Sequence, residues 1–134
     1  MRQDDIATQV HALVDAYRAN DLTAYFGAIS DDATVLIGGK GRADKQMYER
    51  MWTSVIESGG GVVSAEIGDL QVRTAASGDA GVATFMMQVT YRGLVPGDAT
   101  QLVERKLALT EVWFKAGDRW SVAHMDWFDQ PPVA

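Results

Sequence analysis

One carboxylate stands among apolar residues in the C-terminal third of the chain. Glu111 follows Leu107 and Leu109 at alternate positions, in a stretch with the period-two pattern of a β-strand. A charged carboxylate on an apolar face is costly unless it is paired, and such a group often has a shifted pKa and takes part in acid–base chemistry. We therefore expect Glu111 to be a catalytic acid or base with a raised pKa. The alternative is a structural ion pair with Arg105 or Arg73.

A second pair of polar residues lies near the end of the chain. His124 and Asp126 are two positions apart, so they share one face of a strand and could orient two metal ligands. A transition-metal site usually needs three or four ligands, and His11, the other histidine, falls on the polar side of a predicted helix. We therefore expect no metal site, and a polar pair at a subunit contact is the favoured interpretation. Asp31 and Asp32 fall in a predicted turn, where capping explains them.

The composition excludes several classes of function. The 134 residues carry a net charge of −6 and their 12 Lys and Arg are scattered, so there is no basic stripe for nucleic acid and little attraction to an anionic membrane. The chain has no cysteine, and no arrangement suggests a Ser-His-Asp nucleophile. Residues 38–41 (GGKG) lack the spacing of a phosphate-binding loop, so we expect no cofactor. The acidic N-terminus does not resemble a signal peptide, and no segment approaches the roughly 20 apolar residues of a membrane span, which predicts a cytoplasmic location.

The elements that must position these residues follow from periodicity and turn signals. Asp21 is a good N-cap for a short helix, and the glycines after Ser58 end a longer one, whose apolar stripe contains Met47 and Met51. The order of elements predicts one domain, residues 1–134, with helices packed on one face of an antiparallel sheet. The predicted helices cover residues 5–19, 22–29 and 43–57, and the predicted strands cover residues 33–37, 62–74, 80–92, 100–115 and 119–128.

The last hairpin can be registered from its turn. A three-residue loop at residues 116–118 pairs Lys115 with Arg119 and therefore Glu111 with Ala123. The face that carries Glu111 is then nearly all apolar and should meet the helices. The opposite face pairs Thr110 with His124. It also exposes more contiguous apolar surface than a monomer usually leaves in water, which predicts a homodimer through this outer face. Its apolar residues are Val112, Phe114, Trp120, Val122 and Phe128.

The inner face and the helices together predict a pocket for a small, largely apolar ligand. Aromatic residues at helical spacing usually serve packing, but a phenol that points into a cavity can hold a ligand oxygen. The unbranched thioethers of methionine suit an adaptable wall. The predicted lining consists of Phe85, Met87, Val89, Leu109, Met125 and Trp127 from the sheet, and Tyr17, Tyr48, Met51 and Trp52 from the helices.

Two segments resemble a known superfamily. Residues 20–22 (NDL) and 29–35 (ISDDATV) resemble the helix-to-strand segment of ketosteroid isomerase-like proteins, and residues 111–124 (EVWFKAGDRWSVAH) resemble the closing hairpin of the SnoaL-like subgroup. The association domain of calcium/calmodulin-dependent protein kinase shares that hairpin pattern. This resemblance to the nuclear transport factor two-like superfamily implies an α+β, cystatin-like fold. Its expected form is a cone-shaped barrel of a curved antiparallel sheet packed on three N-terminal helices, with a deep apolar pocket and a dimer through the outer sheet faces.

The residues that the resemblance transfers favour some functions over others. The catalytic aspartate of the isomerases falls on Ile37 here, and their oxyanion-holding tyrosine falls on Leu13, with Tyr17 one turn later. Their oxyanion-holding carboxylic acid falls on Glu111. Because only this one of the three functional positions is kept, steroid isomerisation by that mechanism is disfavoured. Our leading hypothesis is a small-molecule pocket protein that is a cofactor-free proton-transfer enzyme of isomerase, dehydratase or cyclase type. The alternative is a non-catalytic ligand-binding or homodimerisation module with Glu111 in an ion pair.

Overall fold

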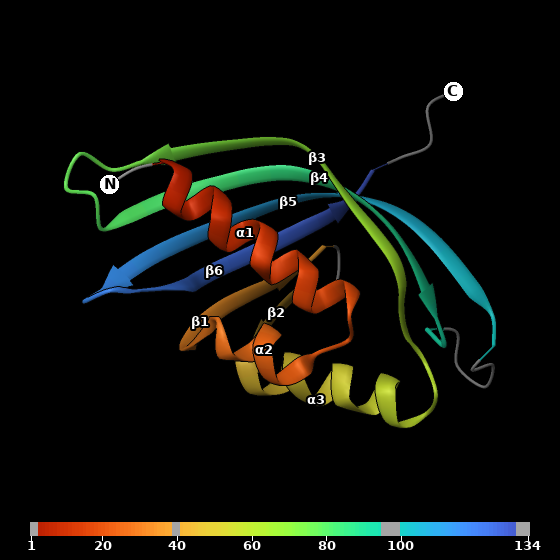
Figure 1. The fold of residues 1–134 in the computed structure, drawn as a ribbon. Coiled ribbons are helices and arrows are strands. Elements are labelled where there is room, and N and C mark those ends of the chain that lie inside the picture. The colour runs from red at the N-terminus through yellow and green to blue at the C-terminus, as the bar shows by residue number, and fades with distance from the viewer. Residues whose placement is uncertain (1–2, 39–40, 95–99, 131–134) are drawn as a thin grey trace.

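The computed structural model describes residues 3–38, 41–94 and 100–130. Three helices lie against one side of a curved six-stranded sheet, which confirms the predicted α+β architecture (Figure 1). The sheet curves without closing, with β2 and β3 at its two edges. The elements run in the order α1 (Gln3–Arg18), α2 (Leu22–Gly27), β1 (Ile29–Ile37), β2 (Gly41–Asp44), α3 (Lys45–Glu57), β3 (Gly61–Thr74), β4 (Ala80–Arg92), β5 (Leu102–Ala116) and β6 (Arg119–Asp129).

The strand order is β2-β1-β6-β5-β4-β3. Four of the neighbouring pairs are antiparallel, but β1 runs parallel to β6, so the prediction of a wholly antiparallel sheet is wrong at this place. A short turn forces two strands to be antiparallel, whereas β1 and β6 are separated by most of the chain and can meet in either direction. Alternation within each strand carries no information about that choice.

The segment between β1 and α3 differs from its predicted form. Residues 38–41 were expected to form a loop and residue 43 to begin a helix. Residues 39 and 40 lie outside the described residues, but Gly41–Asp44 forms strand β2 and α3 begins at Lys45. Asp44 is the N-cap, since its Oδ1 accepts a hydrogen bond of 2.8 Å from the backbone N–H of Met47. Asp21 caps α2 in the same way, at 3.1 Å from the N–H of Ala24, as predicted.

Strand β1 also starts earlier than expected. It begins at Ile29, so the residues predicted to form a turn, Asp31 and Asp32, belong to the strand. Both are exposed, and Asp31 forms an ion pair of 3.0 Å with Lys45 at the start of α3. The ladder between β1 and β6 shifts its register between Ile29 and Thr34, and this irregularity is where the turn signal appeared in the sequence.

A β-bulge in the last hairpin changes which residues of β6 face the helices. The turn is one residue tighter than predicted, with Ala116 opposite Arg119, and the ladder then shifts between Trp113 and Val112. Ala123 is the extra residue of β6 at this shift, so the strand reverses its alternation there. Glu111 consequently pairs with Met125 and not with Ala123, while Leu109 pairs with Trp127.

This bulge corrects the predicted outer face. Trp120 and Val122 were expected outside, but they are 6% and 0% exposed and belong to the core. Phe114 and Phe128 do lie outside, at 53% and 58% exposed. Val112 is partly exposed. The outer face therefore keeps an apolar surface, but a smaller one than the regular alternation predicted.

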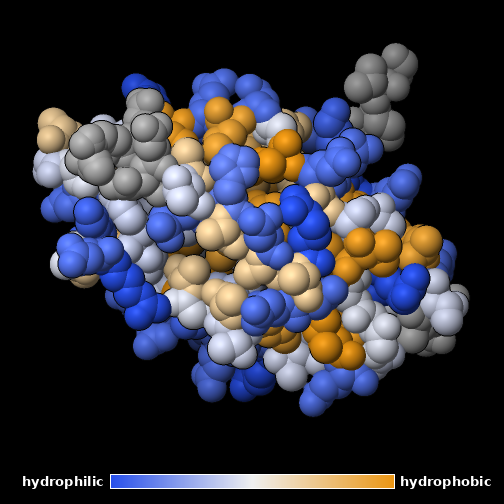
Figure 2. Space-filling model, in the orientation of Figure 1, coloured by the Kyte–Doolittle hydropathy of each residue, from blue (hydrophilic) through white to orange (hydrophobic). Residues whose placement is uncertain are grey.

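The core forms where α1 crosses the concave side of the sheet (Figure 1). The stripe predicted on α1 is buried, from Ile6 and Val10 at 0% exposed to Tyr17 at 9%. Gly81 on β4 allows this contact, since a methyl group at that position would collide with the Ile6 side chain. The opposite side of the helices faces solvent, and Figure 2 shows hydrophobic residues there interspersed with hydrophilic ones. Among the described residues, no helix is both long and apolar enough to cross a membrane.

Helix α3 buries a narrower stripe than predicted. Tyr48 and Trp52 are 3% and 5% exposed, but Met47 and Met51 are 50% and 40% exposed. Tyr48, Trp52 and Val55 follow the spacing of four and three residues that places side chains on one helix face. Met47 lies beside that face, in contact with solvent.

Candidate functional site

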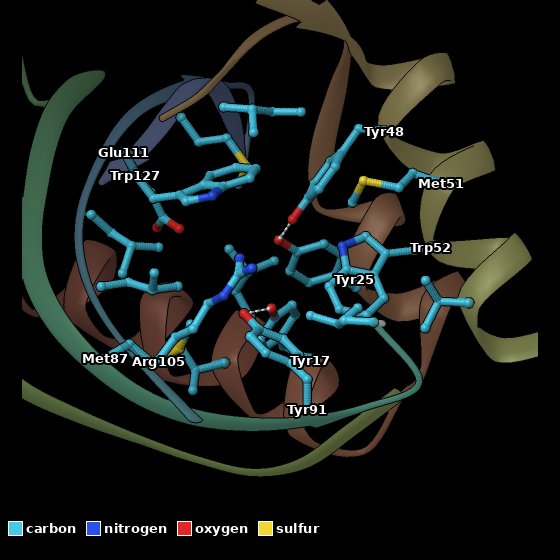
Figure 3. Close-up of a pocket in the computed structure, with 18 of the residues that line it drawn as sticks. Tyr17, Tyr25, Tyr48, Met51, Trp52, Met87, Tyr91, Arg105, Glu111 and Trp127 are labelled. Carbon is cyan, nitrogen blue, oxygen red and sulfur yellow. Dashed lines mark hydrogen bonds between the residues drawn. The ribbon is translucent and has the colours of Figure 1, made fainter. Parts of the chain in front are cut away.

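A cavity of about 280 Å³ lies between the helices and the concave face of the sheet. Nine of the ten residues predicted to line a pocket contribute to its wall (Figure 3): Tyr17, Tyr48, Met51, Trp52, Phe85, Met87, Leu109, Met125 and Trp127. Val89 is the exception. It shares the inner face with Phe85 and Met87 but is packed into the core at 1% exposure and is not part of the lining. Met51 lies at the rim, since it is both part of the wall and exposed.

Other lining residues were not predicted. Tyr91, Arg105 and Leu107 follow the same alternation as Met87 and Leu109, so the strand pattern contained the signal that places them on this face. Tyr25 comes from α2, which is too short to show a helical stripe. Leu13 and Ile37 also line the cavity. They stand at the two positions where the resemblance would place the oxyanion-holding tyrosine and the catalytic aspartate of the isomerases. The remaining members are Val14, Val55, Gly93 and Leu94.

Glu111 is buried in this wall at 2% exposure, and its carboxyl group points into the cavity (Figure 3). Its partners across the ladders are Ala83 and Met125, both apolar. The indole N–H of Trp113 donates a hydrogen bond of 3.2 Å to Glu111 Oε1. Trp113 lies two residues along the same strand face, so alternation could have identified this donor as well.

The electrostatics of Glu111 follow from this environment. Within the described ranges, no nitrogen of Lys, Arg or His lies within 4.0 Å of its carboxylate, so the predicted alternative of an ion pair with Arg105 or Arg73 is not formed. Burial without a counter-charge raises the pKa of Glu111 from 4.5 to about 8, although the hydrogen bond from Trp113 acts in the opposite direction. At neutral pH the side chain is therefore mainly a neutral carboxylic acid, which can donate a hydrogen bond as well as accept one.

Four tyrosines form two hydrogen-bonded pairs in the wall. The hydroxyl oxygens of Tyr17 and Tyr91 lie 2.5 Å apart, and those of Tyr25 and Tyr48 lie 2.8 Å apart (Figure 3). Burial is the largest cause that raises the pKa of each phenol, so all four are neutral in the physiological range. In each pair, one hydroxyl donates its hydrogen to the oxygen of the other. The hydrogen of the second hydroxyl therefore stays available to an acceptor.

Trp52 provides a further donor. It is buried, and its indole Nε1–H makes no hydrogen bond of regular geometry among the described residues, although it is near enough to the Tyr48 hydroxyl to lower the pKa of that phenol. Its ring packs against Tyr17 and Tyr91, with ring centroids 5.4 Å and 5.8 Å apart. In Figure 3 its nitrogen lies on the cavity side, close to the Tyr25–Tyr48 pair. A buried donor without a well-formed hydrogen bond costs free energy, which an acceptor atom in the cavity would recover.

A comparison of the sequence with known protein families identifies the family of this chain. The sequence profile of the SnoaL-like domain family matches residues 6–127. The chain belongs to the SnoaL-like domain family. No curated protein has a matching sequence.

Solved structures share the fold of this SnoaL-like domain at low sequence identity. An NTF2-like protein from Cytophaga hutchinsonii is 15% identical, with a TM-score of 0.79 over 97% of this chain and 100% of that one. A ketosteroid isomerase-like protein from Erwinia carotovora atroseptica is 18% identical, with a TM-score of 0.74 over 97% of each chain. A protein with a cystatin-like fold from Caulobacter vibrioides is 14% identical, with a TM-score of 0.76 over 96% of this chain and 89% of that one. At these identities the likeness establishes the fold alone.

The second polar cluster of the SnoaL-like domain is remote from the cavity. Thr34 Oγ1 lies 2.5 Å from His124 Nδ1, and His124 Nε2 lies 3.0 Å from Asp126 Oδ2, on the outer sheet face. Both ring nitrogens of His124 therefore have a partner within the chain. Because of the bulge, Thr110 pairs with Asp126 and not with His124 as predicted, and Val112 pairs with His124. In the described part of the chain, no group of three potential ligands could hold a metal ion.

Proposed function

We propose that the cavity binds a small, largely apolar molecule and that Glu111 exchanges a proton with it, as in an isomerase, dehydratase or cyclase. One observation carries this proposal: a carboxyl group that is 2% exposed, has no cation within 4.0 Å in the described ranges and faces a cavity. A structural carboxylate at such a place usually has a counter-charge, whereas acid–base residues are often kept apart from one. The cavity is close in size to the lower end, about 300 Å³, of common small-molecule pockets.

The pKa of Glu111 suits both directions of proton transfer. A general acid or base works best when its pKa lies near the operating pH, because both protonation states are then populated. With the pKa of Glu111 near 8, the ionised form takes a proton from a carbon next to a carbonyl group, and the resulting acid returns that proton to the same or a neighbouring carbon. The proton is conserved, so the step needs neither a metal nor an organic cofactor.

The opposite wall supplies donors for the oxygen that gains negative charge in this step. In Figure 3, Tyr25, Tyr48 and Trp52 lie across the cavity from Glu111. The available phenol hydrogen and the indole N–H of Trp52, which makes no hydrogen bond of regular geometry among the described residues, are fixed donors in a site of low polarity. There they stabilise an enolate more than water-exposed groups do. A ligand carbonyl directed at this wall places its neighbouring carbon toward Glu111.

The test is proton exchange on a simple ketone. In D₂O, the wild-type protein should accelerate exchange of the protons next to the carbonyl of 2-tetralone, measured by proton NMR, and the rate should rise with pH and level off above about pH 8. Glu111→Gln should lower the rate by roughly 100-fold, the low end of typical acid–base contributions. Asp126→Asn is the matched control, because it neutralises a carboxylate on the outer face. No acceleration by the wild type would contradict the proton-transfer proposal and favour a non-catalytic binding module.

A further inference from the structure

Arg105 is a cation in the cavity wall that the proton-transfer step does not use. It lies on the inner face of β5, opposite Val89 of β4, and is partly exposed. Its neighbours in sequence, Glu104 and Lys106, are exposed on the other face of the strand. In Figure 3 the guanidinium group of Arg105 extends into the cavity on the side of Tyr17 and Tyr91.

The guanidinium group has no counter-ion in the described part of the chain. No ion pair or hydrogen bond joins Arg105 to another described residue. Among the described residues, Glu111 is the one acidic member of the lining, and it is six residues away along β5 and mainly protonated at neutral pH. Asp129 is close enough to act electrostatically on Tyr91, as Arg105 is, but it is exposed on β6 and forms no ion pair with Arg105.

Such an arginine favours one class of ligand. A guanidinium group presents five N–H donors in a fixed plane that matches the two oxygens of a carboxylate. The rest of the wall is mainly aromatic and aliphatic, and the groups beside Arg105 are neutral phenols that can only add hydrogen bonds. A cationic ligand meets Arg105 as a like charge and finds no ionised carboxylate among the described residues of the wall, so cations are disfavoured.

We propose that the cavity selects apolar molecules with one anionic group, a carboxylate in the simplest case, which Arg105 binds. The apolar body then lies along the aromatic wall, and a carbonyl group at the other end lies between Glu111 and the donors of Tyr25, Tyr48 and Trp52. This inference rests on the proposed function, because it concerns the ligand of the same cavity. It adds the charge of that ligand and the end by which the protein holds it.

The test compares two probes of the same shape. The first is 6-acetyl-2-naphthoate, which has a carboxylate at one end and a ketone at the other, and the second is its neutral carboxamide. Binding is measured by isothermal titration calorimetry at neutral pH. The wild-type protein should bind the carboxylate roughly 10- to 100-fold more tightly than the amide, the effect expected of hydrogen bonds to a charged group.

Three variants assign that preference to Arg105. Arg105→Gln should bind the carboxylate and the amide with equal affinity, the affinity for the amide being that of the wild type, and Arg105→Lys should keep part of the preference. Arg73→Gln removes an exposed arginine of β3 and should leave the preference intact. Unchanged thermal melting shows that each variant is folded.

The outcomes separate this inference from the proposed function. Equal binding of both probes by the wild type, or a preference that survives in Arg105→Gln, would overturn the role of Arg105 while leaving proton exchange on 2-tetralone unaffected. Failure of the wild type to bind either probe would overturn this inference as well as the proposed ligand site.

Discussion

Glu111 links the stability of the protein to pH. Its folded-state pKa, about 8, lies above the ordinary value of 4.5, so the folded protein binds this proton more tightly than the unfolded chain does. The stabilisation that this tighter proton binding contributes to the folded state is fully present below pH 4.5 and is lost as the pH rises through about 8. Because one pH unit in this window corresponds to about 1.4 kcal/mol, the burial of Glu111 costs about 3 kcal/mol at pH 7.

Replacement of Glu111 by glutamine should remove this dependence. Glutamine keeps the shape and can still accept the indole N–H of Trp113, but it has no charge to bury. Glu111→Gln should therefore melt at a similar temperature to the wild type at pH 4.5 and at an increasingly higher temperature as the pH rises toward 8. Thermal unfolding followed by circular dichroism at several pH values measures this. A variant that is less stable at every pH indicates a counter-ion for Glu111.

At the residue scale, much of the site could be predicted from alternation along single strands. Glu111 shares the inner face with four of the six lining residues predicted on the sheet because the pattern within β4 and β5 is regular. The same alternation places Trp113 and Arg105 on the inner face, so it could have identified both residues. What alternation cannot reveal is the absence of an ion pair, because Arg105 occupies the same face and is kept from Glu111 only by its distance along β5.

At the element scale, two departures from prediction occur where one strand pairs irregularly with another, at the start of β1 and in the hairpin of β5 and β6. A bulge depends on how two strands fit together, and nothing in the local sequence distinguishes Ala123 as the extra residue. The tighter turn is consistent with Gly117, which has a φ of 62° that other residues rarely adopt. A single inserted residue then exchanged the faces of Trp120 and Val122, which a regular ladder placed outside.

Helix α3 also shows that local sequence does not determine how an element packs. Its caps and its extent follow from local chemistry, but the width of its buried stripe depends on how closely it packs against the sheet. The apolar residue Met47 is therefore half exposed although its spacing fits the core. Strand β2 was missed because four residues are too few to show a period.

At the scale of the whole molecule, we propose that the protein is a homodimer through the outer face of the sheet. Phe114 and Phe128 leave more than half of their surface exposed there, and a two-fold contact would bury them together with Val112. Light scattering at micromolar concentration should give the mass of two chains. Phe128→Arg should give one folded chain, whereas Val122→Arg places a charge in the core and should prevent folding. A wild-type monomer would contradict the proposal.

The overall fold was easier to predict from the sequence than the strand pairing or the site, because the order and spacing of the helices and strands determine it. Solved structures of proteins at 14% to 18% identity share this fold over 96% or more of the chain, so very different sets of side chains form it. The proposed function depends on a few positions in the cavity, and here Leu13 and Ile37 are apolar while Glu111 and Arg105 are not. Family membership alone therefore does not determine the chemistry.

The proposed chemistry depends on the protonation state of Glu111, which can be measured directly. Glutamate labelled with ¹³C at the side-chain carboxyl gives one NMR signal for each of the five glutamates in the chain. Glu111→Gln identifies the signal of residue 111 by its disappearance. On titration from pH 3 to pH 10, this signal should change with a midpoint near 8. A midpoint for Glu111 at or below the ordinary glutamate pKa of about 4.3 would mean that the carboxylate is paired, and it would contradict the proposed role of Glu111 as an acid and base.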